Sequence, residues 1–166
     1  MQPYAYGFDD EILEGVLAKR LIENKITLAT AESCTGGLIG KRLTDIAGSS
    51  NFFLGSITAY SNDLKINLLG ISENTIKQYG VVSEEVALEM AECIRHNTHA
   101  DIGISTTGIS GPDGGSKTKP LGLVYIAVIT PKISSVKKYI FHTKRNIHRD
   151  MTATAALNIV RLALEI

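Results

Sequence analysis

The chain has 166 residues, of which 44% are hydrophobic, and this is enough for one domain with a sizeable core, expected over residues 1–166. Its 17 basic residues balance 17 acidic ones, which argues against a nucleic-acid or membrane binder and favours a small polar ligand. No segment resembles a signal peptide or membrane span, and two cysteines are too few for a disulfide framework or structural zinc, so we expect a cytoplasmic protein with reduced thiols.

Helical and strand patterns alternate along the first part of the chain. In order, they predict a helix over 12–22, a buried strand over 26–31, a helix over 38–46, a strand over 52–60 and a short helical segment over 63–69. Ser72 can cap a further short helix that Gly80 ends, and Ser83 opens a long helix that stops near His99.

The second part of the chain predicts three strands and a final helix. The strands lie over 101–107, 121–130 and 136–141, and the helix runs from about residue 146 to the C-terminus. The last two strands are close in sequence and should form an antiparallel hairpin, with 136–141 nearer an edge. Because parallel neighbours need a crossover helix, we expect an α/β fold, a three-layer α/β/α sandwich with a mixed, partly parallel sheet of about five strands.

Three polar segments each follow a predicted strand. They are the turn over 32–37, the segment over 60–65 and the glycine-rich loop over 108–116. Ligands of such sheets bind beyond the carboxyl ends of parallel strands, so these segments should converge on one rim. The turn suits a nucleophile or a phosphate clamp, because unpaired amides and the positive end of a helix dipole meet there, although Ser33 could be a simple helix cap.

A nucleophile at this turn needs a base. Ser33 and Cys34 are both candidates, and the residues alone do not choose between them, but only one should face the pocket. None of the four histidines lies in a recognisable triad pattern. Lys65 could act as the base if burial disfavours its ammonium form, with Tyr60 relaying or holding the proton; the alternative is a solvated surface lysine.

Anion recognition has two candidate elements. The 108–116 loop is an incomplete match to a phosphate-binding P-loop and leads into a strand rather than a helix, so it is better interpreted as an anion or ribose cradle or as a plain turn. Arg145 and Arg149 lie one helical turn apart, and one or both could meet a phosphate. A solvated basic face is the alternative.

Five motifs in this order resemble the C-terminal domain family of the competence-damage-inducible protein CinA, whose stand-alone members are nicotinamide mononucleotide deamidases, also called PncC. The motifs are Ala31-Glu32-Ser33-Cys34-Thr35-Gly36-Gly37, Asp45-Ile46-Ala47-Gly48-Ser49-Ser50, Tyr60-Ser61-Asn62 with Lys65, Gly80-Val81-Val82-Ser83, and Thr107-Gly108-Ile109-Ser110-Gly111-Pro112-Asp113-Gly114-Gly115. The resemblance covers nearly the whole chain from about Leu13.

The resemblance implies hydrolysis of the carboxamide of nicotinamide mononucleotide to nicotinate mononucleotide and ammonia. It makes Ser33 the nucleophile, Lys65 its base and Tyr60 an assisting residue, with no metal or organic cofactor and a pyridine nucleotide as the small-molecule partner. Contacts to the substrate, the oxyanion among them, are expected from the following residues: Thr35, Gly36, Gly37, Thr107, Gly108, Gly111 and Arg145.

Two departures from the family leave alternatives open. Relatives often have Gly-Asp-Arg before the last helix, where this chain has Thr143-Lys144-Arg145. A noncatalytic nucleotide- or partner-binding module is therefore an alternative. A cysteine hydrolase that uses Cys34 is a separate alternative, left open by the two candidate nucleophiles of the turn. Many relatives also carry an N-terminal nucleotide-pyrophosphatase domain, for which this chain has no room, and a homodimer is expected by resemblance only.

Overall fold

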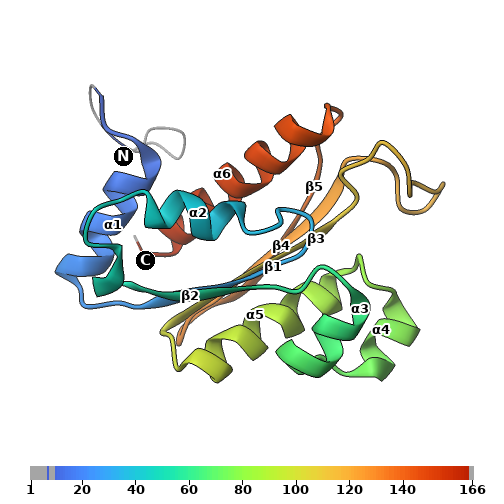
Figure 1. Cartoon of the computed structure of the whole chain (residues 1–166), viewed down its shortest axis with the longest axis horizontal. Coiled ribbons are helices and arrows are strands. Elements are labelled where there is room, and N and C mark those ends of the chain that lie inside the picture. The colour runs from blue at the N-terminus through green and yellow to red at the C-terminus, as the bar shows by residue number, and fades with distance from the viewer. Residues whose placement is uncertain (1–6, 8–9, 165–166) are drawn as a thin grey trace.

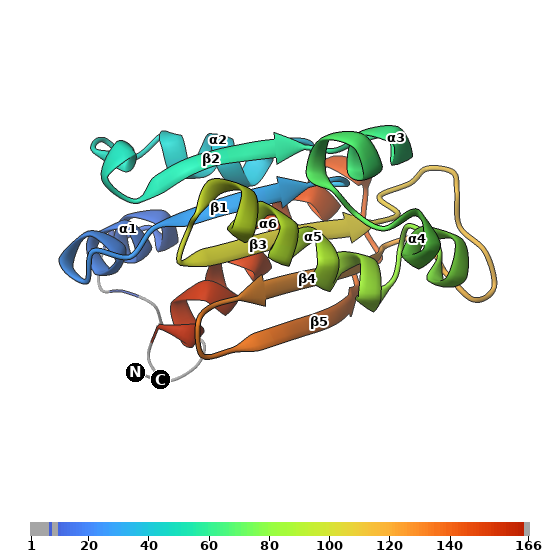
Figure 2. The ribbon, with the colours of Figure 1, turned by 90° about the horizontal axis from the view of Figure 1, so that it is seen from below.

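A five-stranded mixed sheet forms the centre of the protein in the computed structural model, which describes residue 7 and residues 10–164 (Figures 1 and 2). The spatial order is β2-β1-β3-β4-β5. The strands are β1 (Leu28–Glu32), β2 (Phe53–Thr58), β3 (Ile102–Gly108), β4 (Leu123–Ile129) and β5 (Ser134–Ile140). β1 pairs in parallel with β2 and β3, whereas β3-β4 and β4-β5 are antiparallel. The mixed sheet and the terminal hairpin predicted from the sequence are confirmed.

Helices cover both faces of this sheet (Figure 1). The regular elements are α1 (Leu13–Glu23), α2 (Leu38–Thr44), α3 (Asn62–Leu64), α4 (Glu73–Tyr79), α5 (Glu84–Thr98) and α6 (Arg145–Ala163), with a 3-10 turn over Ser49–Asn51 and a π-helical turn over Lys65–Leu69. One apolar core joins α1, α2 and α6 to the sheet, and a second lies between the sheet and α5. The three-layer α/β/α sandwich is therefore confirmed.

The observed element ends differ from the predicted ones by a few residues, with local causes. β1 begins at Leu28 rather than at residue 26, because the Thr27 amide donates to the Asp101 carboxylate at 2.8 Å. Ser83 caps α5 as predicted, since its hydroxyl accepts from the Val86 amide. Ser72 also stands at a helix start, but its side chain makes no cap hydrogen bond and its amide donates to Glu89 instead.

Parallel pairing sets the position of the functional residues. β1, β2 and β3 point the same way, so the segments that follow them leave the sheet at one edge (Figure 2). These segments are the turn after Glu32, the 59–65 connection and the loop after Gly108. The rim expected from the sequence is thus present in the fold.

Candidate active site

A pocket of about 220 Å³ lies where the three segments meet. Ser33 and Cys34 line it from the first segment, Tyr60 and Lys65 from the second, and Gly108 and Ser110 from the third. Residues separated by more than 70 positions in the sequence therefore share one small polar cavity.

Ser33 and Lys65 are in direct contact in this pocket. The Lys65 Nζ atom lies 3.0 Å from Ser33 Oγ, within the range for proton transfer between a nucleophile and its base. Ser33 is held by its own amide, which donates to the Thr106 carbonyl on β3 at 3.0 Å. The predicted nucleophile and the predicted base are thus brought together by the fold.

The environment of Lys65 favours the uncharged amine. The side chain is only 2% exposed, and burial lowers the pKa of Lys65 below its ordinary value of 10.5. Its other contacts are the Ala59 carbonyl at 2.9 Å and the Tyr60 carbonyl at 3.4 Å. A neutral amine can donate its two protons to these carbonyls and keep its lone pair for the Ser33 proton.

Cys34 is an unsuitable nucleophile in this arrangement. The residue is 6% exposed and belongs to the core beneath the turn, although it also contributes to the pocket wall. Burial raises the pKa of the Cys34 thiol to about 12, so the thiolate is scarce at neutral pH. In this geometry Ser33, and not Cys34, makes the hydrogen bond with the Lys65 amine.

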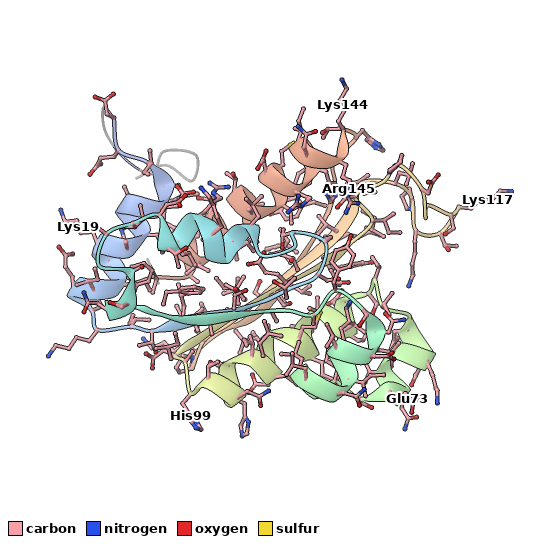
Figure 3. All side chains as sticks on the ribbon, viewed as in Figure 1. Lys19, Glu73, His99, Lys117, Lys144 and Arg145 are labelled. Carbon is pink, nitrogen blue, oxygen red and sulfur yellow. The ribbon has the colours of Figure 1, made fainter. Side chains whose placement is uncertain are left out.

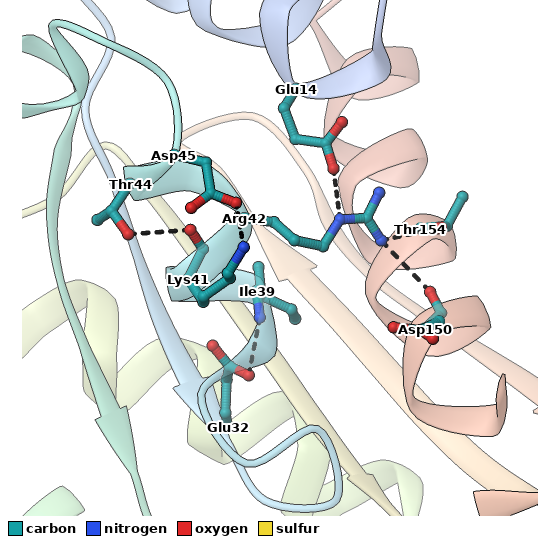
Figure 4. A network of polar contacts seen from close by, with 9 residues as sticks. All are labelled: Glu14, Glu32, Ile39, Lys41, Arg42, Thr44, Asp45, Asp150 and Thr154. Atoms are coloured by element: carbon teal, nitrogen blue, oxygen red, sulfur yellow. Dashed lines mark hydrogen bonds and ion pairs between the residues drawn. The ribbon is translucent and has the colours of Figure 1, made fainter. Parts of the chain in front are cut away.

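Glu32 is a structural residue of the turn that sequence reasoning missed (Figure 4). Its fully buried carboxylate accepts from the Ile39 amide at 3.1 Å and from the Gly40 amide at 2.8 Å. These amides belong to the first turn of α2 and would otherwise lack partners. The protein's own carboxylate therefore fills the anion site that the sequence suggested for a phosphate. An acidic residue at the end of a buried strand, shortly before a predicted helix, was the available signal.

Thr35, Gly36 and Gly37 support the turn from outside the pocket lining. Thr35 is fully buried, and its hydroxyl is 2.8 Å from that of Thr106. The Gly36 amide donates to the Ser33 carbonyl at 3.1 Å, which removes it as a free donor. Both glycines have positive φ, +60° and +88°, a region in which other residues are strained. Their substrate contacts remain predictions.

Thr107 and Gly108 lie in the pocket wall, whereas their predicted contacts with a substrate stay predictions. The Thr107 hydroxyl donates to the Val81 carbonyl at 2.6 Å. A Cβ atom at Gly108 would approach the Leu123 carbonyl oxygen to 2.7 Å, so this close packing requires glycine. The neighbouring Ser110 hydroxyl is buried and has no hydrogen-bond partner among the described residues.

Arg145 lies at the mouth of the pocket, whereas Arg149 does not. Arg145 donates to the Tyr60 hydroxyl at 2.8 Å and to the Gly111 carbonyl at 2.9 Å, and it also lines an adjacent pocket of about 580 Å³. Arg149 instead donates to the Thr35 carbonyl through Nε at 3.1 Å and Nη2 at 2.6 Å. The two arginines, paired by spacing in the sequence, therefore have different contacts.

Among the residues that the structure describes, no histidine lines the pocket that holds Ser33 and Lys65. His148 is buried, with Nε2 3.0 Å from the Gly122 carbonyl, and burial lowers its pKa below the ordinary 6.5. No group of three or more His, Cys, Asp or Glu residues within residues 10–164 is placed to hold a metal ion. No helix in the same range is long and apolar enough to cross a membrane.

The fold and the site together define an α/β domain with a serine–lysine pair at the carboxyl edge of its parallel strands. The model of the CinA C-terminal domain family matches residues 10–164. The chain belongs to the CinA C-terminal domain family, as the sequence motifs indicated.

Relatives and solved structures agree with this assignment. A relative from Clostridium tetani named as a competence-damage inducible protein is 49% identical over 156 residues, which are 94% of this chain and 38% of the relative. A CinA-like protein from Thermotoga neapolitana is 44% identical over 162 residues, 98% of this chain and 40% of the relative. The chain thus spans about two fifths of the length of the curated relatives it matches.

Two crystal structures show the same fold. The competence/damage inducible protein CihA from Agrobacterium tumefaciens is 35% identical, with a TM-score of 0.83 and coverage of 96% of this chain and 99% of that one. A CinA superfamily protein from Klebsiella pneumoniae 700603 is 28% identical, with a TM-score of 0.89 and coverage of 92% and 96%. The mixed sheet with its covering helices is therefore the family fold.

Proposed function

We propose that this domain hydrolyses the carboxamide of nicotinamide mononucleotide to nicotinate mononucleotide and ammonia, with Ser33 as nucleophile and Lys65 as base. The observation that carries the proposal is the 3.0 Å contact between Ser33 Oγ and a lysine amine that is nearly inaccessible to solvent. A buried lysine without a carboxylate among its contacts costs folding stability, and an active-site base is a reason to keep it.

The reaction would proceed through a covalent intermediate. Ser33 Oγ adds to the amide carbonyl while its proton moves to Lys65 Nζ, which gives a tetrahedral oxyanion. Lys65 then donates that proton to the amide nitrogen, the C–N bond breaks, and ammonia leaves an ester on Ser33. Water, deprotonated by Lys65, cleaves the ester and releases the carboxylate product and the free serine.

The Gly108 amide is the best-placed candidate donor to the oxyanion. Hydrogen-bonded pairs alternate along antiparallel strands, and the Ile109 amide donates to Leu123 on β4. The amide of Gly108 therefore faces the opposite side, towards the end of β1 and the pocket that holds Ser33. Of the backbone amides that the sequence suggested as oxyanion donors, that of Gly36 already donates to the Ser33 carbonyl, so Gly108 is the stronger candidate.

Ammonia release from nicotinamide mononucleotide tests the proposal. The wild-type chain and Ser33→Ala are incubated with the nucleotide, and ammonia and nicotinate mononucleotide are measured. We expect the substitution to lower kcat by about 10³-fold or more, because the covalent route is removed. Equal release by the two proteins would exclude Ser33, and nucleotide binding without any release would favour the noncatalytic module instead.

A further inference from the structure

Arg145 connects three segments across the mouth of the pocket. It opens α6, lies 85 residues from Tyr60 and 34 from Gly111 in the sequence, and donates one hydrogen bond to each. It also lines both the 220 Å³ pocket of the serine–lysine pair and the adjacent 580 Å³ pocket. Its side chain therefore borders both pockets, as Ser110 does, and is placed to contact a ligand that reaches from one pocket into the other.

The second pocket has the chemistry of an anion site. Lys144 and His142 line it beside Arg145. Figure 3 shows both basic residues near the start of α6, with Lys144 extending outward. Within the described chain, neither of the two pockets has an aspartate or glutamate in its lining. A guanidinium has five N–H donors, and two are used by Tyr60 and Gly111, so 5 − 2 = 3 remain for a phosphate.

The backbone carbonyl and the side-chain hydroxyl of Tyr60 contact different residues, Lys65 and Arg145 respectively. Its carbonyl contacts the Lys65 amine at 3.4 Å, whereas its hydroxyl accepts from Arg145 at 2.8 Å. The side chain is 58% exposed, so packing alone does not fix it, and its hydrogen bond with Arg145 restrains both flexible groups. The observed contacts of the hydroxyl are thus those of an orienting partner and not of a proton relay.

We propose that the Tyr60 hydroxyl is a positioning group that holds Arg145 for the phosphate of the substrate, and so makes the site select nucleotides over the corresponding nucleosides. This inference rests on the proposed function, since it assumes that the carboxamide lies at Ser33 and the phosphate at Arg145. Tyr60 then acts on substrate recognition, and this role differs from the relay or holding of a proton that the sequence position of Tyr60 suggested.

The test is Tyr60→Phe, which removes the hydroxyl and keeps the ring. Turnover is measured with nicotinamide mononucleotide and with nicotinamide riboside, which lacks the phosphate. We expect KM for the nucleotide to rise about two- to tenfold with little change in kcat, and the preference for nucleotide over riboside to fall by the same factor. Tyr79→Phe, which removes an exposed hydroxyl outside both pockets, is the matched control.

A double substitution shows whether Tyr60 acts through Arg145. Arg145→Lys keeps the positive charge but lacks the two guanidinium nitrogens that contact separate partners. Tyr60→Phe should therefore change KM much less in the Arg145→Lys variant than in the wild type. A fall in kcat on both substrates, an unchanged nucleotide preference, or fully additive effects would each overturn the proposal.

Binding separates this inference from the proposed reaction. Calorimetry with nicotinamide mononucleotide is carried out on Ser33→Ala and on Ser33→Ala with Tyr60→Phe. Suppose that the wild type releases no ammonia, but that Tyr60→Phe in the Ser33→Ala background weakens nucleotide binding by two- to tenfold and leaves riboside binding unchanged. The proposed hydrolysis is then wrong, and the positioning role of Tyr60 stands. If the nucleotide does not bind, or binds both proteins equally, the positioning role is wrong.

Discussion

The Glu32 carboxylate accepts a hydrogen bond from the Gly40 amide at 2.8 Å, so the residue directly before Ser33 closes the first turn of α2. Ser33 is thereby placed between a strand and a helix that are joined through one buried side chain. The Thr30 and Ser56 hydroxyls also lie 3.3 Å from Oε1 of this carboxylate, so both of its oxygens accept hydrogen bonds within the protein.

Glu32→Gln should destabilise the protein because one of the two acceptor oxygens becomes an amide group that faces donors. We expect a loss of about 2 kcal/mol in the free energy of unfolding. For a chain of 166 residues this corresponds to a fall in Tm of roughly 4–8 °C, measurable by calorimetry. Glu73→Gln, which breaks only the exposed pair with Lys77, should stay within about 0.5 kcal/mol of wild type. Equal Tm values for the wild type, Glu32→Gln and Glu73→Gln would contradict the role of Glu32 in capping α2.

The activity should follow the titration of Lys65. Only the neutral amine accepts the Ser33 proton, so kcat/KM should rise with pH and level off once Lys65 is deprotonated. Because burial lowers its pKa, the midpoint should lie below 10.5. The check is a pH profile of nicotinamide mononucleotide hydrolysis over the range in which the protein stays folded.

Lys65→Arg provides the complementary measurement. Arginine stays protonated, so we expect a loss of about 10²–10⁴-fold and no recovery at high pH. Lys77→Arg, on the exposed face of α4, is the matched control. A profile that falls as pH rises through neutrality, or an active Lys65→Arg, would rule out the base assigned here.

Cys34 should resist thiol reagents in the native protein. Its thiol is buried and its pKa is raised to about 12, whereas Cys93 is only half-buried. In Cys93→Ser we therefore expect no labelling by a disulfide reagent near pH 8 until denaturant is added, when one thiol appears. Cys34→Ala should retain most of the turnover. Rapid native labelling, or loss of activity with Ser33→Ala still active, would restore the cysteine mechanism.

The sequence was sufficient for the fold because each element has a distinct local signal. The strand that ends at Glu32 is mostly apolar and is buried along its whole length, since helices cover both faces of β1. Ser83 marks the start of α5 because its hydroxyl accepts from the amide of Val86, only three residues further on. The convergence of Ser33 and Lys65 was also predictable, because both follow parallel strands that end at one edge.

The orientation of individual side chains was not predictable in the same way. Arg145 and Arg149 share a helix face by spacing, yet they contact different segments because the direction in which α6 packs on the sheet decides what each one meets. The same applies to Tyr60, whose carbonyl and hydroxyl contact different residues. Tertiary packing determines these side-chain contacts, and no local sequence pattern predicts them.

His148 should make stability depend on pH below neutrality. Burial lowers its pKa, its Nε2 contacts the Gly122 carbonyl, and Nδ1 has no partner among the described residues. Below pH 6.5 the unfolded chain binds a proton that the folded one resists, so the free energy of unfolding should fall as pH decreases from 6.5 towards the lower folded pKa.

Denaturant unfolding of wild type and His148→Gln between pH 5 and 8 measures this effect. Glutamine can still donate to Gly122 but does not titrate, so its stability should fall less steeply on acidification. His96→Gln, on the surface of α5, is the control for removing a histidine. Parallel curves for wild type and His148→Gln would show that His148 is not responsible.

Arg149 should affect catalysis through the turn that carries Ser33. Its Nε and Nη2 atoms both donate to the Thr35 carbonyl, and its guanidinium lies against Gly36. Lysine cannot reproduce this forked contact, so Arg149→Lys should lower kcat about tenfold while KM for the nucleotide changes little. The opposite pattern, a raised KM with normal kcat that disappears when nicotinamide riboside replaces the nucleotide, would mean that Arg149 binds the phosphate. Since Arg145→Lys should give that second pattern, measuring the two variants side by side tests whether Arg149 orients Ser33 while Arg145 recognises the substrate.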